Sequence, residues 1–197
     1  MKDKNTLFIQ HRINSIDELK TVPEDYGVET DIRIYKDKII LNHDPFEDGI
    51  SFDSFLEHYN HKFLIINVKC DGAEKQILDK LKEKSINDFF FLDSSMPTTI
   101  NLMTSGTSNI AIRYSKYEPI ELAMKFKNHI DWIWIDCFDG FELTKEDYIT
   151  LKKHFKICLV SPELQGYPKD KIEEFKILSN DMNIDAICTK FPKIWKK

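Results

Sequence analysis

The stretch "DWIWIDCFDGFELTKEDYITLKKHFKICLVSPE" (residues 131–163) contains the repeating unit on which the fold depends. It begins with an apolar run at 131–138, continues with a polar segment at 143–155 and ends with a second apolar run at 156–163. Short runs rich in β-branched and aromatic residues predict buried strands. Thr144 is a favourable N-cap for a helix between them. The stretch therefore predicts a strand, a helix and a second strand.

The same alternation extends in both directions from this unit. Strands are predicted at 6–12, 26–35 (with a return segment at 37–44), 62–70, 88–95, 109–115, 131–138, 156–163 and 184–192, and helices at 15–20, 73–84, 119–130, 143–155 and 169–182. Eight strands that mostly alternate with helices predict the α/β class and a small (β/α)8 TIM barrel. We expect one domain over residues 1–197, with its last helix reduced to "KIWKK" or missing. A doubly wound open sheet is the alternative, but no glycine-rich phosphate loop follows a predicted strand.

Composition limits the class of partner. The formal net charge is −5, which disfavours binding of nucleic acid by bulk charge. No segment is long and apolar enough to span a membrane, and the first residues lack the apolar region of a secretory leader. The four cysteines are widely spaced, which is typical of a reducing compartment. We therefore expect a cytoplasmic protein that acts on a small molecule, while its oligomeric state stays open.

Polar side chains gather where the predicted strands end, which is where barrel enzymes build their active sites. Glu29 and Asp31 are two residues apart, so they share one face of a strand, and they are hard oxygen ligands suited to Mg²⁺, Ca²⁺ or Mn²⁺. The other candidates at strand ends are His11, Arg12, Arg33, His43, Asp44, Asn67, Lys69, Asp93, Arg113, Asp136, Glu163 and Lys190. Each feature alone also fits an exposed polar face, whereas the series on consecutive strands suggests a phosphate site with a metal.

This series resembles the glycerophosphodiester phosphodiesterases, within the wider group of phosphatidylinositol-phospholipase-C-like barrels. The family's His-Arg, Glu-x-Asp and His-Asp motifs correspond to "HR" (11–12), "ETD" (29–31) and "HD" (43–44). Its Glu-x-Lys motif corresponds in place to "NVK" (67–69), and its closing strand to "IDAICTKFP" (184–192). The likeness covers nearly the whole chain. It implies that this protein is a short, divergent member of that family.

The resemblance implies one divalent cation, Mg²⁺ or Ca²⁺ with Mn²⁺ as a further option, held by Glu29, Asp31 and Asn67. It implies that His11 and His43 form an acid-base pair. Substrate phosphate would be bound by Arg12 and Lys69 in the family motifs. Outside those motifs, Arg113 and Glu163 are further candidates for substrate binding, with salt bridges inside the barrel as the alternative. Asp44 either orients His43 or caps the turn.

Three positions depart from the family pattern. Ile13 stands where the family usually has glycine after His-Arg, Asn67 replaces the third acidic metal ligand, and Lys190 replaces an aspartate of the closing strand. An amide oxygen can bind Ca²⁺ or Mg²⁺, but it brings no charge. The departures leave three functions open: a metal-dependent phosphodiesterase acting on a glycerophosphodiester or on a polyol or sugar phosphodiester, a metal-independent lyase that forms a cyclic phosphate, and a binder without turnover. Lipid metabolism and surface-polysaccharide precursor metabolism, in a bacterium with an AT-rich genome, are the expected settings.

Overall fold

The computed structural model describes residues 6–196, and the chain divides into two compact units. Residues 6–10 and 108–196 form the unit that we call the α5–α8 unit after its helices. Residues 11–107 form the α1–α4 unit. The single domain expected over residues 1–197 stays a prediction.

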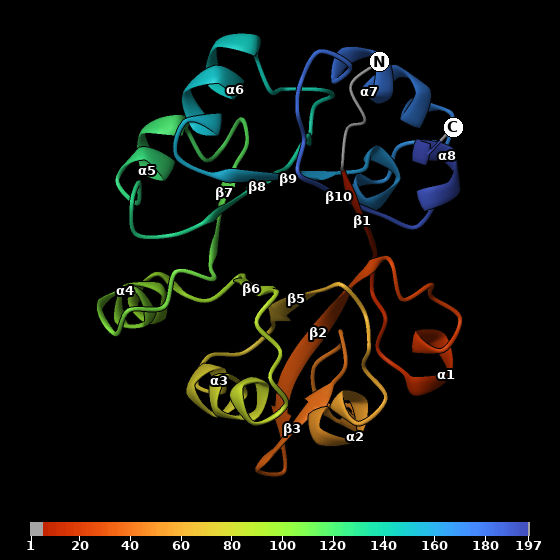
Figure 1. Ribbon diagram of the computed structural model, residues 1–197, viewed down its shortest axis with the longest axis vertical. Coiled ribbons are helices and arrows are strands. Elements are labelled where there is room, and N and C mark those ends of the chain that lie inside the picture. The colour runs from red at the N-terminus through yellow and green to blue at the C-terminus, as the bar shows by residue number, and fades with distance from the viewer. Residues whose placement is uncertain (1–5, 197) are drawn as a thin grey trace. The chain divides into compact units, whose positions relative to one another are not determined.

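The α5–α8 unit contains a sheet of five parallel strands in the order β1-β10-β9-β8-β7. The strands are β1 (Leu7–Gln10), β7 (Ala111–Tyr114), β8 (Trp132–Ile135), β9 (Lys156–Val160) and β10 (Ala186–Thr189). Every residue of β8 and β10 is buried, as expected for a parallel sheet whose two faces are covered. The helices α6 and α7, which connect β8 to β9 and β9 to β10, lie on the same side of this sheet (Figure 1). This is the arrangement expected when crossovers of the usual right-handed kind advance in one direction.

The described part of this unit has four α-helices, and one of them begins at the N-cap that the sequence predicts, Thr144. They are α5 (Ile120–Met124), α6 (Lys145–Lys152), α7 (Lys171–Leu178) and the short closing helix α8 (Pro192–Lys196). The Thr144 hydroxyl accepts a hydrogen bond from the Asp147 amide at 3.0 Å, which satisfies one of the free N–H groups of the first turn. The α8 helix corresponds to the reduced last helix that the sequence predicts.

The α1–α4 unit is built around the long strand β2 (Gly27–Tyr35). On one side β2 pairs in parallel with β5 (Phe63–Val68), which pairs in parallel with β6 (Phe89–Leu92). On the other side β2 pairs antiparallel with the return strand β3 (Lys38–Leu41), and β3 pairs antiparallel with β4 (Ile50–Ser51). The helices of the unit are α1 (Ile16–Leu19), α2 (Phe52–Leu56), α3 (Glu74–Glu83) and α4 (Met96–Thr104) (Figure 1).

All eight parallel strands coincide with predicted strands, each one to five residues shorter than its predicted range. The sequence did not predict α2, α4, the two-residue strand β4 or the 3₁₀ turn at Pro162–Gln165. The α4 helix contains threonine and asparagine residues, which have low intrinsic helix propensity. Burial of Thr99 and Leu102 stabilises it in place of propensity.

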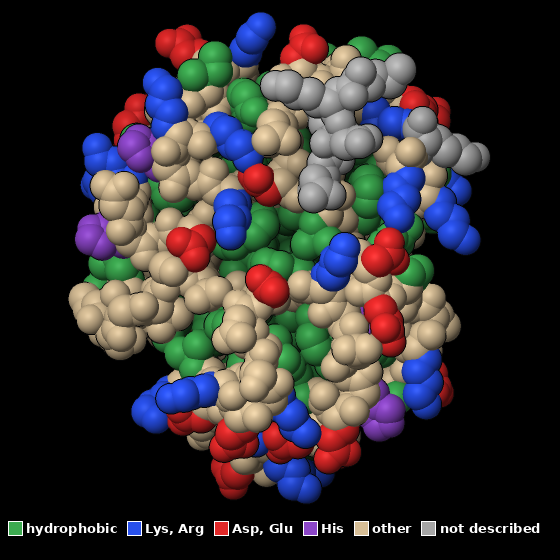
Figure 2. Space-filling model, in the orientation of Figure 1, with side chains coloured by type: hydrophobic (Ala, Val, Ile, Leu, Met, Phe, Trp, Pro, Cys, Tyr) green, Lys and Arg blue, Asp and Glu red, His purple; other side chains and the backbone are tan. Residues whose placement is uncertain are grey.

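The surface carries both signs of charge. Figure 2 shows Lys and Arg side chains interspersed with Asp and Glu on the face in view. Among residues 6–196, no helix combines the length and the apolar character needed to cross a bilayer.

Candidate active site

The two acids of β2 lie side by side and almost completely out of solvent. Glu29 and Asp31 are each 1 % exposed and alternate with the buried, uncharged residues Val28, Thr30 and Ile32 of the same strand. Their neighbour across the parallel ladder is Asn67, which pairs in register with Asp31. Side chains two residues apart on a strand share one face, so β2 brings both carboxylates to the face on which Asn67 lies. The sequence prediction of a shared face is confirmed.

Each oxygen of Glu29 has its own donor. Asn67 Nδ2 donates to Oε1 at 2.8 Å, and the backbone N–H of Arg12 donates to Oε2 at 2.7 Å. His11 Nε2 lies 3.7 Å from Oε2. Burial, followed by repulsion from Asp31, raises the pKa of Glu29 from 4.5 to about 7. The hydrogen bonds from these donors only partly offset the rise in pKa. The native fold therefore destabilises the ionised form of this carboxyl group relative to the protonated form.

Asp31 is surrounded by cationic and amide donors. Lys69 Nζ lies 3.4 Å from Oδ1, and Arg12 Nε lies 3.7 Å from Oδ2. Asn14 Nδ2 donates to Oδ2 at 2.8 Å, while Asn14 Oδ1 accepts from the Asp31 amide and from the Thr30 hydroxyl. No role was predicted for Asn14 from the sequence. An amide side chain two residues after His-Arg, in the loop that follows a strand, was the available signal for this contact.

The loop after β1 shows how the backbone turns although position 13 is isoleucine and not glycine. The residue in the left-handed region is Arg12, with φ of 56°, and not the residue that follows it. Ile13 donates its N–H to the carbonyl of Glu29 at 2.8 Å, and its side chain is buried. A non-glycine residue in this region is strained and persists where surrounding contacts fix it. The isoleucine therefore anchors the loop through packing while Arg12 makes the turn.

His43 follows β3 and pairs with its neighbour in sequence. Its Nδ1 lies 2.8 Å from Asp44 Oδ1, and this hydrogen bond lowers the pKa of Asp44. The Asp44 amide donates to Asn42 Oδ1 at 2.9 Å. Asp44 therefore orients His43 through its carboxylate, whereas the turn is closed by the side chain of Asn42. With Nδ1 as the donor, Nε2 is the ring nitrogen left for proton exchange.

Lys69 lies between two acids. Besides Asp31, its ammonium is 3.8 Å from Asp93 Oδ2, at the end of β6. Asp93 adopts φ of 65°, so the site has a second strained non-glycine residue. The contacts thus bring together six of the nine residues for which the sequence predicts a catalytic, metal-binding or substrate-binding role: His11, Arg12, Glu29, Asp31, Asn67 and Lys69. His43 belongs to the same unit, and Arg33 links its carbonyl to that of Lys69.

The oxygen atoms at this site suit a hard divalent cation. Among residues 6–196 no group of three or more His, Cys, Asp and Glu side chains suits a metal, so a third ligand has to be another oxygen. Asn67 Oδ1 is buried and accepts no hydrogen bond from the described residues. A buried, unpaired carbonyl oxygen beside two carboxylates is the kind of ligand that Mg²⁺ and Ca²⁺ accept. Glu29, Asp31 and Asn67 therefore fit such a cation.

The remaining two candidates belong to the α5–α8 unit. Arg113 forms an ion pair with Asp136, which also accepts hydrogen bonds from Trp134 Nε1 at 3.1 Å and Gln165 Nε2 at 2.8 Å. Burial raises the pKa of Asp136, and Arg113 opposes that rise.

Glu163 Oε1 accepts hydrogen bonds from the Thr189 hydroxyl and the Lys190 amide, at 2.6 and 2.9 Å. Its other oxygen accepts from Ser161. Both Arg113 and Glu163 are thus engaged within their own unit, in agreement with the salt-bridge and loop alternative. Their substrate-binding roles stay predictions.

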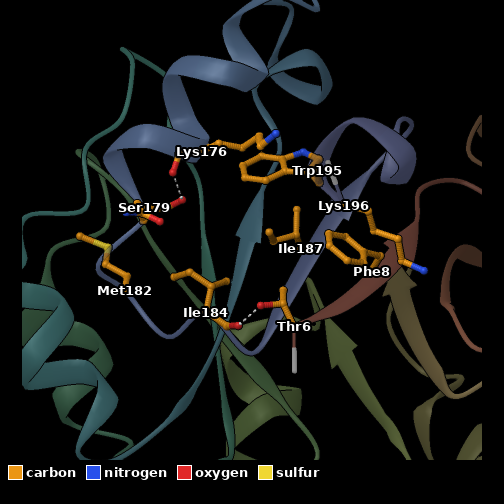
Figure 3. Close-up of a pocket in the computed structure, with 10 residues that line it drawn as sticks. Thr6, Phe8, Lys176, Ser179, Met182, Ile184, Ile187, Trp195 and Lys196 are labelled. Atoms are coloured by element: carbon orange, nitrogen blue, oxygen red, sulfur yellow. Dashed lines mark hydrogen bonds between the residues drawn. The ribbon is translucent and has the colours of Figure 1, made fainter. Parts of the chain in front are cut away.

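A cavity of about 350 Å³ lies elsewhere in the α5–α8 unit, beside the residues that precede β1 and β10 (Figure 3). Phe8, Ile184, Ile187 and Trp195 give it an apolar lining, with Lys176 among the polar residues. It is near the amino ends of these strands, whereas barrel enzymes work at the carboxyl ends. Lys176 Nζ donates to the carbonyl of Ile194 at 3.0 Å, so its charged end is already hydrogen-bonded. We assign no catalytic role to this cavity.

Comparison with known proteins shows what the fold is similar to. No family model and no curated protein matches the chain. Among solved structures, a glycerophosphodiester phosphodiesterase from Agrobacterium tumefaciens has a TM-score of 0.71 at 15 % identity, covering 98 % of this chain and 100 % of that one. A glycerophosphoryl diester phosphodiesterase from Parabacteroides distasonis has a TM-score of 0.63 at 12 % identity, covering 96 % and 84 %. The chain therefore has the TIM-barrel-like α/β fold that these two proteins share.

Proposed function

We propose that this protein is a metal-dependent phosphodiester hydrolase. The observation that carries the proposal is the convergence of two buried acids, a histidine and two cations: His11 lies 3.7 Å from Glu29, and Lys69 and Arg12 lie 3.4 and 3.7 Å from Asp31. Hydrolysis of a phosphodiester requires charge stabilisation on phosphate and proton transfer at two oxygens. The cluster contains groups for each task. Its occurrence on a fold shared with glycerophosphodiester phosphodiesterases adds support.

Glu29, Asp31 and Asn67 would hold the divalent cation, Mg²⁺ or Ca²⁺, with Mn²⁺ as a further option. When bound, such a cation polarises a phosphoryl oxygen and lowers the pKa of an attacking hydroxyl. Arg12 and Lys69 are the chain's own phosphate-binding groups. Arg12 is 45 % exposed and offers a planar set of donors, whereas Lys69 is held closer to the acids and supplies a point charge.

The two histidines perform the proton transfers in this proposal. Asp44 holds His43 through Nδ1, so His43 exchanges protons at Nε2. His11 Nε2 lies 3.7 Å from Glu29 Oε2, so the imidazole sits beside the proposed metal and phosphate groups. One histidine takes a proton from the attacking hydroxyl, and the other gives one to the leaving alkoxide. The histidine on the side of the attacking hydroxyl would accept its proton. The histidine on the side of the leaving group would donate one.

The expected substrate is a small glycerophosphodiester or a polyol or sugar phosphodiester, in lipid or surface-polysaccharide precursor metabolism. Where a hydroxyl neighbours the phosphoester, that hydroxyl can attack first and form a cyclic phosphate. The closed (β/α)8 barrel and the cytoplasmic location expected from the sequence belong to the same proposal.

The test is turnover of glycerophosphocholine and of bis-p-nitrophenyl phosphate with Mg²⁺, Ca²⁺, Mn²⁺ or EDTA. We expect metal-dependent turnover that His11→Ala, His43→Ala and Asp31→Ala each reduce by at least about 100-fold, the usual contribution of a positioned acid or base. His58→Ala is the matched control, because His58 is exposed. Full activity in both active-site histidine variants would refute the proposal. Binding of the substrate without turnover under any metal would indicate a binding protein.

A second candidate is metal-independent cleavage to a cyclic phosphate. It is favoured by the two cations beside Asp31, because they already supply positive charge where a metal would act. Undiminished turnover in EDTA, with a cyclic phosphate detected by ³¹P NMR, would establish this reaction. Complete loss of turnover in EDTA would reject it.

A further inference from the structure

Arg33 contacts the backbone at two functional residues without belonging to any of the motifs. It follows Asp31 by two residues on β2, so it points to the same face of the strand. Its Nε and Nη2 donate to the carbonyl of His43 at 3.1 and 2.8 Å. Its Nη1 donates to the carbonyl of Lys69 at 3.1 Å. All three guanidinium nitrogens are therefore used on main-chain oxygens.

These two carbonyls belong to segments that are far apart in the sequence. His43 lies in the loop between β3 and β4, whereas Lys69 follows the last residue of β5. A planar guanidinium has five N–H donors in a fixed arrangement, so its contacts define direction as well as distance. Hydrogen bonds from a charged donor are also the stronger kind. The side chain thus connects the backbone of the proposed acid-base histidine to the backbone of the proposed phosphate-binding lysine.

The other contacts of the His43 loop do not make this connection. Asn42 Nδ2 donates to the carbonyl of Asp48, and the Gly49 amide donates to Asp48 Oδ1, at 2.8 Å each. These bonds close the loop on itself. The Asn42 amide donates to the Asp31 carbonyl at 3.1 Å, which attaches the start of the loop to β2. Among the hydrogen bonds of this loop, those of Arg33 are the ones that bridge it to the end of β5.

We propose that Arg33 is a positioning residue that holds His43 and Lys69 at a fixed separation. The catalytic part of this inference rests on the proposed function, whereas the connection between the two segments does not. Misplacing His43 affects proton transfer, and misplacing Lys69 affects phosphate binding, so loss of Arg33 should change both kcat and KM. A displacement of about 1 Å in a catalytic group can lower the rate 100-fold.

The first experiment measures amide hydrogen exchange in segments 42–49 and 69–73 of the full chain, in Arg33→Met, Arg33→Lys and a matched control. The control is Lys38→Met, which removes an exposed cation from the same β2–β3 hairpin. We expect at least about tenfold faster exchange in both segments for Arg33→Met, an intermediate effect for Arg33→Lys and no change for Lys38→Met. Unchanged exchange, or a change in one segment alone, would overturn the inference.

The second experiment measures kcat, KM and thermal unfolding in the same variants. We expect Arg33→Met to lower kcat by at least about tenfold and to raise KM, with Arg33→Lys recovering part of both. A lower unfolding temperature with kcat and KM within twofold of wild type would overturn the positioning role. Absence of turnover in the wild type would refute the proposed function instead, and the exchange experiment would still decide whether Arg33 connects the two segments.

Discussion

Replacement of Glu29 by glutamine should stabilise the protein while it removes a proposed metal ligand. The pKa of Glu29 rises from 4.5 to about 7 in the native state, chiefly through burial and then through repulsion from Asp31. At about 1.4 kcal/mol for each pH unit, this gap corresponds to about 3 kcal/mol. Between pH 4.5 and 7 the native state keeps a proton that the unfolded chain has lost. The free energy of unfolding therefore falls as pH rises through this window and is level above it.

Glutamine has the shape of glutamate and does not titrate. Its amide oxygen can accept from the Arg12 amide, as Glu29 Oε2 does at 2.7 Å. Its Nε2 would then face Asn67, whose unpaired Oδ1 can turn toward it and accept a hydrogen bond. The substitution therefore leaves no donor facing another donor, and the stability gain is not offset by a lost hydrogen bond.

The assay is urea unfolding of the wild type and Glu29→Gln at pH 4 and pH 8, with EDTA present to exclude cations. The two proteins should have similar stability at pH 4, and the variant should be more stable by about 2–3 kcal/mol at pH 8. The matched control is Glu24→Gln, an exposed glutamate for which we expect a change within about 0.5 kcal/mol. Equal or lower stability of Glu29→Gln at pH 8 would refute the reasoning.

Three further predictions follow from individual contacts. Asn67→Asp adds a charged oxygen beside Glu29 and Asp31 and should raise Ca²⁺ affinity about tenfold, measured by calorimetry; unchanged affinity would exclude Asn67 as a ligand. Thr144→Ala removes the N-cap of α6 and should lower the free energy of unfolding by about 1 kcal/mol, whereas Thr150→Ala, in the same helix, should not. Of the four cysteines only Cys70 is partly exposed, and burial raises the pKa of the Cys137 thiol to about 12. A thiol reagent at pH 8 should therefore modify one thiol in the native protein and all four in denaturant. Modification of more than one thiol in the native protein would contradict this prediction.

The sequence predicts the strands and the acids well for identifiable reasons. The parallel strands are short apolar runs such as "WIWI", and their burial leaves little alternative to a sheet. The shared face of Glu29 and Asp31 follows from the two-residue period of a strand, which tertiary contacts do not alter. These features depend on local periodicity alone.

The features that the sequence did not predict depend on contacts between distant segments. The α2 helix has five residues, too few to show a helical period, and its cap is the hydroxyl of Ser51. Asn14 becomes part of the site because it reaches Asp31 across 17 positions. Arg33 can be placed on the correct face of β2 because it follows Asp31 by two residues. Its partners are backbone carbonyl groups, which every residue has, so the sequence does not indicate which of them Arg33 contacts.

Position 67 has an amide where the family that the sequence resembles has a third acidic ligand. The other charges of the site are consistent with this uncharged side chain. With Glu29 ionised, as metal binding would require, Glu29, Asp31 and Asp93 bring three negative charges, and Arg12 and Lys69 bring two positive ones. A divalent cation would change the sum from −1 to +1, which matches the single negative charge of a phosphodiester. With a third carboxylate the loaded site would be neutral, and the substrate's charge would be uncompensated in a region where Glu29 and Asp31 are already desolvated. Asn67→Asp should therefore bind Ca²⁺ more tightly and the phosphodiester less tightly, and a gain in affinity for both would contradict this charge balance.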